Sequence, residues 1–185
     1  MTHVREATGG TRASSEGAAA RPPLAGVTAA VITVSDRRAA GTAQDTAGPA
    51  VSAALTRHGA VVEAWVVPDG VAPVSGAIEG AMASRTRVII TVGGTGVGPR
   101  DLTPEATEPL LARQLPGIPE LIRAAGAASA PAAALSRGLA GVTAGTPGSV
   151  IVNAPGSERG ALEAAHVVLP LLPHLLSQLD GGDHP

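Results

Sequence analysis

The stretch that decides the fold is RVIITVGGTGVGPRDLTPEAT, residues 87–107. Its first six residues are an arginine followed by an almost wholly apolar, β-branched run, which predicts a buried strand over residues 87–92 that ends at Gly93-Gly94. The TPE sequence that begins at Thr103 predicts a helix start. In that reading the threonine is the cap, the proline takes the first helical position and the glutamate lies near the positive end of the dipole. A strand, a glycine-rich loop and a helix thus follow one another.

The same alternation continues on both sides of this stretch. Strands that alternate with helices indicate an α/β protein with a mainly parallel sheet covered on both faces. Further strands are predicted at residues 27–34, 61–67, 139–144 and 149–153. Further helices are predicted at residues 46–58, 71–84, 118–127 and 158–179, the last with kinks at Pro170 and Pro173.

Length and composition fit one folded domain with extensions. The chain has 185 residues, of which 44% are hydrophobic and 15% charged. Residues 1–24 show neither helical nor strand periodicity, so we expect a disordered N-terminal tail there. The folded domain is expected over residues 25–180, with a frayed C-terminus over 181–185.

Composition also excludes several functions. A net charge of −2 argues against a globally basic nucleic-acid binder, and the absence of Phe and Tyr argues against a base-stacking platform. The absence of cysteine excludes disulfides and thiolate metal sites and fits a reducing compartment. No apolar run has the length of a membrane span, and the N-terminus lacks the apolar core of a secretory signal. We therefore expect a cytoplasmic protein with neither nucleic-acid nor membrane partners.

The isolated aromatic and histidine residues are expected to be structural. Trp65 lies in a predicted strand and is assigned to the core. His58, His166 and His174 have no metal-ligand spacing, so they are expected to be solvated or edge residues.

The segments that follow the predicted strands are the candidates for a ligand site, because parallel sheets bind ligands outside the carboxyl ends of their strands. These segments are residues 35–45, 68–70, 93–101 and 153–157. The third is rich in glycine, which lets backbone N–H groups approach a phosphate. It has neither the lysine of a P-loop nor the third glycine of a dinucleotide fingerprint, and a tight strand-to-helix turn is the structural alternative.

Asp69 and Asp101 follow two neighbouring strand candidates. Two carboxylates and a bound phosphate together suit Mg²⁺, which can polarise a phosphoryl group and neutralise a leaving pyrophosphate. The alternative for Asp69 is a turn residue, and for Asp101 a capping acid at a helix start.

Six motifs occur in an order that resembles the MogA/MoaB family of molybdenum cofactor biosynthesis. The resemblance covers about residues 26–180. The motifs are Val34-Ser35-Asp36-Arg37, Pro68-Asp69, Thr91-Val92-Gly93-Gly94-Thr95-Gly96, Arg100-Asp101-Leu102-Thr103-Pro104-Glu105-Ala106-Thr107, Leu135-Ser136-Arg137 and Asn153-Ala154-Pro155-Gly156-Ser157.

The resemblance implies a three-layer α/β/α sandwich that assembles as a homotrimer. It implies that Mg²⁺, ATP and molybdopterin react to give adenylyl-molybdopterin and pyrophosphate, with a molybdenum-insertion enzyme as a partner. Asp69 and Asp101 match the catalytic aspartates and would hold the metal. The nucleotide and its phosphates would be bound by Gly93, Gly94, Thr95, Gly96, Ser35 and Asp36. Molybdopterin would be bound by Thr103, Glu105, Ser136, Arg137, Pro155, Gly156 and Ser157.

Two other functions stay open on the sequence. The chain could bind molybdopterin without catalysis, as a carrier or scaffold of the same pathway, or it could be a nucleotide-binding domain of another pathway. Arg100-Asp101-Leu102-Thr103-Pro104-Glu105-Ala106-Thr107 has the form found in MogA-type chains, which favours the enzyme. The departures are Ala154, where leucine is common, and the long N-terminal tail.

Overall fold

The computed structural model describes residues 21–182 of the chain. Strands and helices alternate along these residues, as predicted. The strands are β1 (Thr28–Val34), β2 (Val61–Val67), β3 (Val88–Val92), β4 (Arg113–Gln114), β5 (Ala140–Val142) and β6 (Val150–Ala154). The helices are α1 (Asp36–Ala39), α2 (Ala47–Arg57), α3 (Val71–Ala83), α4 (Thr103–Thr107), α5 (Gly117–Ala127), α6 (Glu158–Val168) and α7 (Leu172–Leu179), with 3-10 turns η1 (Glu108–Leu110) and η2 (Pro131–Leu135).

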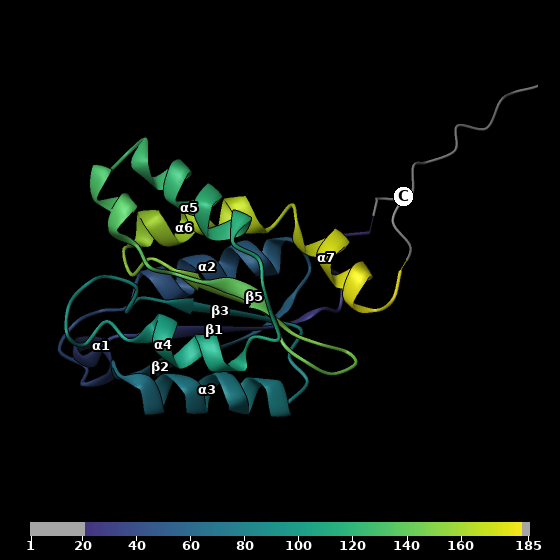
Figure 1. The fold of residues 1–185 in the computed structure, drawn as a ribbon, viewed down its shortest axis with the longest axis horizontal. Coiled ribbons are helices and arrows are strands. Elements are labelled where there is room, and N and C mark those ends of the chain that lie inside the picture. Colours follow the sequence, from purple (N-terminus) through teal and green to yellow (C-terminus); the bar gives the residue numbers. More distant parts are fainter. Residues whose placement is uncertain (1–20, 183–185) are drawn as a thin grey trace, which may run out of the picture.

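These strands form one sheet in the order β2-β1-β3-β6-β5-β4. Strands β2, β1, β3 and β6 run parallel to one another, and β5 is antiparallel to both of its neighbours, β6 and β4. Helices α3 and α4 cover one face of the sheet, and α2, α5 and α6 cover the other (Figure 1). The prediction of a three-layer α/β/α sandwich with a mainly parallel sheet is confirmed.

The central strands are apolar on both faces because helices cover both faces. Val31 packs in the core under α2 and α6, and the next residue, Ile32, packs in the core under α3. Strand β2 forms the edge of the sheet, so its side chains are less buried. Val61 is 60% exposed, and Trp65 is half-buried against the core under α3.

The long C-terminal helix predicted over residues 158–179 is two helices. α6 ends at Val168 and α7 begins at Leu172, and their axes differ by 57°. Pro170 lies in the break, because proline cannot donate the backbone hydrogen bond that would continue the helix. No single helix in residues 21–182 has the length and apolar composition of a membrane span, although the bent pair α6–α7 meets that test jointly.

The folded domain begins earlier than the predicted boundary at residue 25. Leu24 is fully buried in the core, and its backbone N–H donates to the His58 carbonyl oxygen at 2.8 Å. At the other end, Gly182 N–H donates to the Ser177 carbonyl oxygen at 2.9 Å, so the first residues of the predicted frayed end close α7. Residues 1–20 of the predicted tail and residues 183–185 lie outside the described part of the chain.

Candidate active site

Four loops meet at the carboxyl ends of β1, β2, β3 and β6, and they are the segments singled out from the sequence. Two cavities open there. The first, which we call the aspartate cavity, has a volume of about 380 Å³. It is lined by Val34, Ser35, Asp36, Arg37, Arg38, Asp69, Gly93, Gly94, Asp101 and Gly156.

The aspartate cavity brings together Asp69 and Asp101, the two predicted catalytic residues. They do not follow neighbouring strands, because β1 lies between β2 and β3. Asp69 comes directly from the end of β2, and Asp101 reaches the cavity from the far end of the glycine-rich loop. The prediction of neighbouring strands was therefore wrong, because strand order along the chain differs from strand order in the sheet.

A reciprocal pair of hydrogen bonds fixes Asp69. Asp36 N–H donates to Asp69 Oδ2 at 2.7 Å, and Asp69 N–H donates to Asp36 Oδ1 at 3.1 Å. Arg100 binds Asp36 with two nitrogen atoms, at 2.9 and 3.1 Å, and donates to the Asp69 carbonyl oxygen at 2.7 Å. The hydrogen bonds from Arg100 lower the pKa of Asp36 below its ordinary value. Asp36 therefore acts here as an ionised link between β1, β2 and Arg100.

Both predicted catalytic carboxylates are held through one oxygen atom. Asp101 Oδ2 accepts a hydrogen bond from Gly98 N–H at 2.9 Å, as Asp69 Oδ2 does from Asp36. Within residues 21–182 the Oδ1 atoms of Asp69 and Asp101 accept no hydrogen bond, and no three acidic or histidine side chains cluster as a metal site. Two carboxylates with open oxygen atoms fit Mg²⁺, which binds one or two carboxylates together with water and substrate phosphates.

The glycine-rich loop needs glycine at its first two positions. Gly93 and Gly94 have φ angles of +112° and +63°. A Cβ atom would collide with the Val34 carbonyl oxygen at Gly93 and with Thr103 Oγ1 at Gly94. In the part of the chain that the structure covers, the N–H groups of Gly94, Thr95 and Gly96 have no protein acceptor. This loop can therefore present consecutive N–H groups to an anion.

Thr103 has a different place from the predicted one. Leu102 takes the capping position of α4, and Thr103 and Pro104 are the first two helical residues. Thr103 does not cap the helix, because it lies one residue after the capping position, and its hydroxyl donates to the Gly93 carbonyl oxygen at 2.9 Å. Thr103 is fully buried and lines neither cavity, and its role is to hold the glycine-rich loop against α4.

Arg137 holds the other side of the same loop. It donates to the Gly96 carbonyl oxygen at 2.7 Å and to the Asp101 carbonyl oxygen at 2.5 Å, and it forms an ion pair with Glu105. The hydrogen bond from Arg137 lowers the pKa of Glu105. Arg137 and Glu105 line neither cavity, so the structure places these predicted ligand-binding residues behind the loop.

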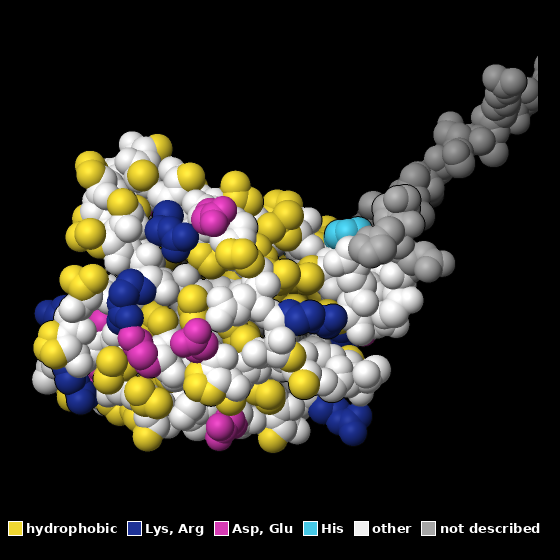
Figure 2. Space-filling model, in the orientation of Figure 1, with side chains coloured by type: hydrophobic (Ala, Val, Ile, Leu, Met, Phe, Trp, Pro, Cys, Tyr) yellow, Lys and Arg dark blue, Asp and Glu magenta, His cyan; other side chains and the backbone are white. Residues whose placement is uncertain are grey.

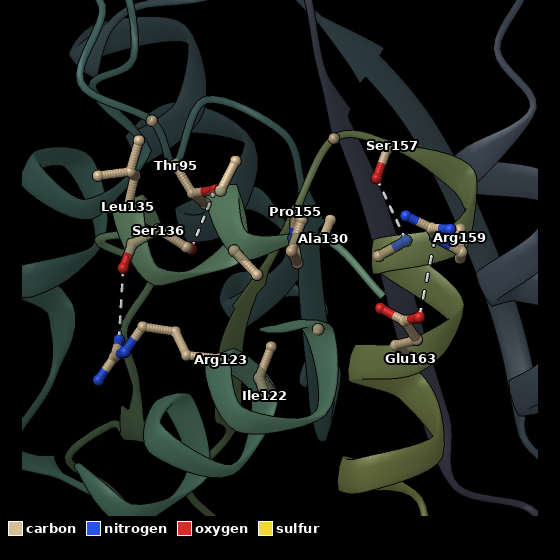
Figure 3. A pocket seen from close by; sticks show the side chains of 16 residues that line it. Thr95, Ile122, Arg123, Ala130, Leu135, Ser136, Pro155, Ser157, Arg159 and Glu163 are labelled. Carbon is tan, nitrogen blue, oxygen red and sulfur yellow. Dashed lines mark hydrogen bonds and ion pairs between the residues drawn. The ribbon is translucent and has the colours of Figure 1, made fainter. Parts of the chain in front are cut away.

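The second cavity lies between η2, α5 and α6 and has a volume of about 280 Å³ (Figure 3). We call it the α6 cavity. Predicted site residues form one side of it: Thr95, Gly96, Ser136, Pro155, Gly156 and Ser157. Residues that the sequence analysis missed form the rest: Ile122, Arg123, Gly126, Ala130, Ala132, Ala133, Leu135, Arg159, Gly160 and Glu163.

The partition between the two cavities is backbone. Gly156 lines both cavities, and a Cβ atom on it would lie 3.2 Å from the Gly93 Cα atom. Arg38, on the side of the aspartate cavity, binds this partition. It donates to the Gly156 carbonyl oxygen at 3.3 Å and lies 3.7 Å from the Asp45 carboxylate. Ser157 follows the partition and caps α6, because its hydroxyl accepts from Gly160 N–H at 3.2 Å.

The buried residue Asn153 anchors the end of β6 below these loops. Its side-chain amide donates to the hydroxyls of Thr91 and Thr107, at 2.9 and 3.0 Å, and accepts from Leu139 N–H at 3.1 Å. The histidines lie elsewhere: His58, His166 and His174 line neither cavity.

The fold and the loops define the class of the protein. It is an α/β protein whose candidate ligand site lies at the carboxyl ends of the parallel strands. The family model described as "Probable molybdopterin binding domain" matches residues 30–174. The chain belongs to the MogA/MoaB family of molybdenum cofactor biosynthesis proteins, as its motifs predict.

Individual relatives agree with this assignment. The chain is 43% identical over 162 residues to a molybdenum cofactor biosynthesis bifunctional protein of Synechococcus elongatus, covering 87% of this chain and 50% of the relative. It is 34% identical over 148 residues to a molybdopterin adenylyltransferase of Pyrococcus furiosus, covering 79% of this chain and 87% of the relative. The crystal structure of the molybdopterin biosynthesis enzyme MoaB from Thermus thermophilus has a TM-score of 0.76 and 43% identity, covering 84% of this chain and 97% of that one. The chain thus spans about half the length of the bifunctional relatives.

Proposed function

We propose that this chain catalyses the adenylylation of molybdopterin by ATP, which gives adenylyl-molybdopterin and pyrophosphate. The observation that carries the proposal is the shared wall of the two cavities. One cavity holds two carboxylates with open oxygen atoms, and the other, across Gly156, has a largely apolar lining. The glycine-rich loop borders both cavities, with Gly93 and Gly94 in one and Thr95 and Gly96 in the other, so the reacting groups of two substrates would meet along this loop. The names of relatives such as the molybdopterin adenylyltransferase of Pyrococcus furiosus support the same reaction.

In the proposed reaction, a terminal phosphate oxygen of molybdopterin attacks the α-phosphorus of ATP. A new phosphorus–oxygen bond forms, and the bond to the β-phosphate oxygen breaks and releases pyrophosphate. The protein's task is to position the reactants and stabilise charge, as in phosphoryl transfer generally. We assign the open N–H groups of Gly94, Thr95 and Gly96 to the ATP phosphates. Ser35 and Asp36 are assigned to the nucleotide side of the site.

Asp69 and Asp101 are the residues that would hold Mg²⁺. The ion, when bound, would neutralise negative charge on the phosphates of ATP. Ser136, Pro155, Gly156 and Ser157 line the α6 cavity, and we assign them to molybdopterin. Thr103, Glu105 and Arg137 would support the site from behind through the bonds described above.

Measurement of pyrophosphate release tests the proposal. The chain is incubated with ATP, Mg²⁺ and molybdopterin, with parallel reactions that lack molybdopterin or contain a chelator. We expect pyrophosphate only in the complete mixture, in proportion to the molybdopterin supplied. Molybdopterin binding without pyrophosphate would instead support a carrier or scaffold. Tight ATP binding without pterin binding would indicate a nucleotide-binding domain of another pathway.

The expected assembly and partners extend the same proposal. A homotrimer, and delivery of adenylyl-molybdopterin to a molybdenum-insertion enzyme, follow from the family resemblance. The cytoplasmic location is expected from the composition, which fits a reducing compartment. These three points stay predictions.

A further inference from the structure

Glu163 presents a carboxylate to the α6 cavity. It lies on α6 beyond Ser157 and Arg159, and Figure 3 shows its side chain directed toward the wall across the cavity. Oε1 accepts from the Ser129 hydroxyl at 2.8 Å and lies 3.8 Å from Arg159 Nε. Across residues 21–182, no donor binds Oε2. Glu163 therefore keeps acceptor capacity for a ligand, because each carboxylate oxygen has two lone pairs.

The wall that faces Glu163 suits a flat ring. It is formed by Ile122, Ala130, Ala133 and Leu135, which carry no polar side-chain atoms. Gly126 keeps the space beside the carboxylate open. A Cβ atom at Gly126 would lie 3.6 Å from Glu163 Oε2 and 2.9 Å from the Ala133 Cβ atom. A volume of about 280 Å³ is near the lower end of small-molecule sites, so it matches one bicyclic ring system.

A carboxylate beside this apolar wall favours a ring whose edge carries hydrogen-bond donors, because an ionised carboxylate can only accept hydrogen bonds. The 2-amino-4-oxopyrimidine ring of a pterin presents two parallel donors, the amino group and the adjacent ring N–H. Adenine presents a donor beside a ring-nitrogen acceptor, which a carboxylate repels. A carboxylate here would thus separate the pterin substrate from the adenine of ATP.

We propose that Glu163 is the specificity-determining residue of the α6 cavity and reads the amino-amide edge of the pterin ring. The proposal rests on the proposed function, which makes molybdopterin a substrate. Ser129 and Arg159 orient the carboxylate through Oε1 and leave Oε2 toward the ring.

A pair of small ring compounds tests Glu163 without any turnover. Pterin carries the 2-amino group, and lumazine has a carbonyl oxygen in its place. Binding of each to the full chain is measured by saturation-transfer NMR and fluorescence titration. We expect the wild-type chain to bind pterin at least about tenfold more tightly than lumazine, because the carboxylate would lose a charged hydrogen bond and face an oxygen.

Glu163→Gln keeps the size of the side chain and an acceptor for Ser129 but removes the carboxylate. We expect it to bring the pterin-to-lumazine ratio to within about threefold of unity, with an unchanged melting temperature. Glu79→Gln is the matched control, because it makes the same change at an exposed glutamate of α3 that lines neither cavity, and it should keep the selectivity.

The outcomes separate this assignment from the proposed reaction. A wild-type ratio retained by Glu163→Gln would overturn the role of Glu163, as would failure of the wild-type chain to bind pterin. Release of pyrophosphate in either of those cases would leave the proposed reaction standing. Selective pterin binding that depends on Glu163, without pyrophosphate release, would support Glu163 and overturn the reaction.

Discussion

Asp36 and Asp69 each accept a hydrogen bond from the other's backbone N–H, at 3.1 and 2.7 Å respectively, which couples the two loops. The pair ties the end of β1 to the end of β2. Arg100 donates to the Asp36 carboxylate and to the Asp69 carbonyl oxygen, and it directly precedes Asp101 in the chain. The Arg100 guanidinium group thereby links the segment that carries Asp101 to the ends of β1 and β2.

Loss of the Asp101 charge should impair the chemical step. We expect Asp101→Asn to lower the rate of adenylylation by at least about tenfold, because the amide keeps the shape but removes one carboxylate from the proposed metal site. Molybdopterin binding should persist, because Asp101 lies outside the α6 cavity. Single-turnover pyrophosphate release and a separate binding titration check the two parts. A turnover close to that of the wild type would remove Asp101 from the site.

Arg100 should act through the positions of the aspartates. We expect Arg100→Ala to lower kcat by about tenfold with a smaller change in the KM for molybdopterin, because displaced catalytic groups slow the reaction more than they weaken binding. Arg100→Lys should restore part of the rate, since lysine keeps the charge but not the two-nitrogen contact. Arg57→Ala, at an exposed arginine at the end of α2, is the control. A change in KM alone would contradict this role.

The ion pair between Arg100 and Asp36 predicts that the stability of the fold depends on pH. The pKa of Asp36 is lowered in the folded chain, so its stabilising contribution is complete above the unfolded pKa and is lost as the pH falls through the folded value. The melting temperatures of the wild type and Arg100→Gln should therefore differ at pH 7. They should converge as the pH falls below about 4. A difference that stays constant down to pH 3 would show that the pair is not responsible.

The glycine-rich loop should tolerate no side chain at its first position. We expect Gly93→Ala to cost at least about 2 kcal/mol, because φ is +112° and the new methyl group would meet the Val34 carbonyl oxygen. The melting temperature should fall by about 4–8 °C. Gly80→Ala is the matched control in the exposed part of α3, where a Cβ atom meets nothing within 4 Å. It should stabilise the fold by about 0.5–1 kcal/mol. Equal effects of the two substitutions would contradict the argument.

Asn153 should be more important for stability than its single side chain suggests. Asn153→Ala leaves the buried hydroxyls of Thr91 and Thr107, and the Leu139 N–H group, without their present partner. We expect a loss of about 2–4 kcal/mol in the free energy of unfolding, measured by urea denaturation. Thr56→Ala removes one exposed hydrogen bond and should cost less than about 0.5 kcal/mol. A loss below 1 kcal/mol for Asn153→Ala would mean that water replaces the amide.

Local patterns were sufficient to predict the layers of the fold and to place part of the candidate site. Strand β3 and the loop after it could be predicted, because apolar β-branched runs and glycines indicate local structure without information on distant residues. Asp69 and Asp101 could be placed at one edge because parallel strands share a carboxyl edge. The break after Val168 was only suggested, by Pro170.

The arginine contacts could not be predicted in this way. Arg137 is 32 residues from Glu105, and Arg100 is 64 residues from Asp36, so only the tertiary structure pairs them. Thr103 looked like a helix cap because the sequence does not reveal that α4 begins at Thr103 itself, with Leu102 at the capping position. Arg159 and Glu163, which the sequence analysis missed, did leave a signal in the sequence. Their four-residue spacing places both side chains on one side of α6.

The glycine partition between the cavities also limits how this scaffold can be redesigned. Gly93 and Gly156 approach each other as bare main chain, so no substitution there can reshape the boundary without forcing the loops apart. Altered preferences, whether selected in the laboratory or acquired in evolution, would have to arise on the outer surfaces, such as η2 and the exposed side of α6. Variant libraries should therefore randomise those surfaces and leave the dividing glycines unchanged.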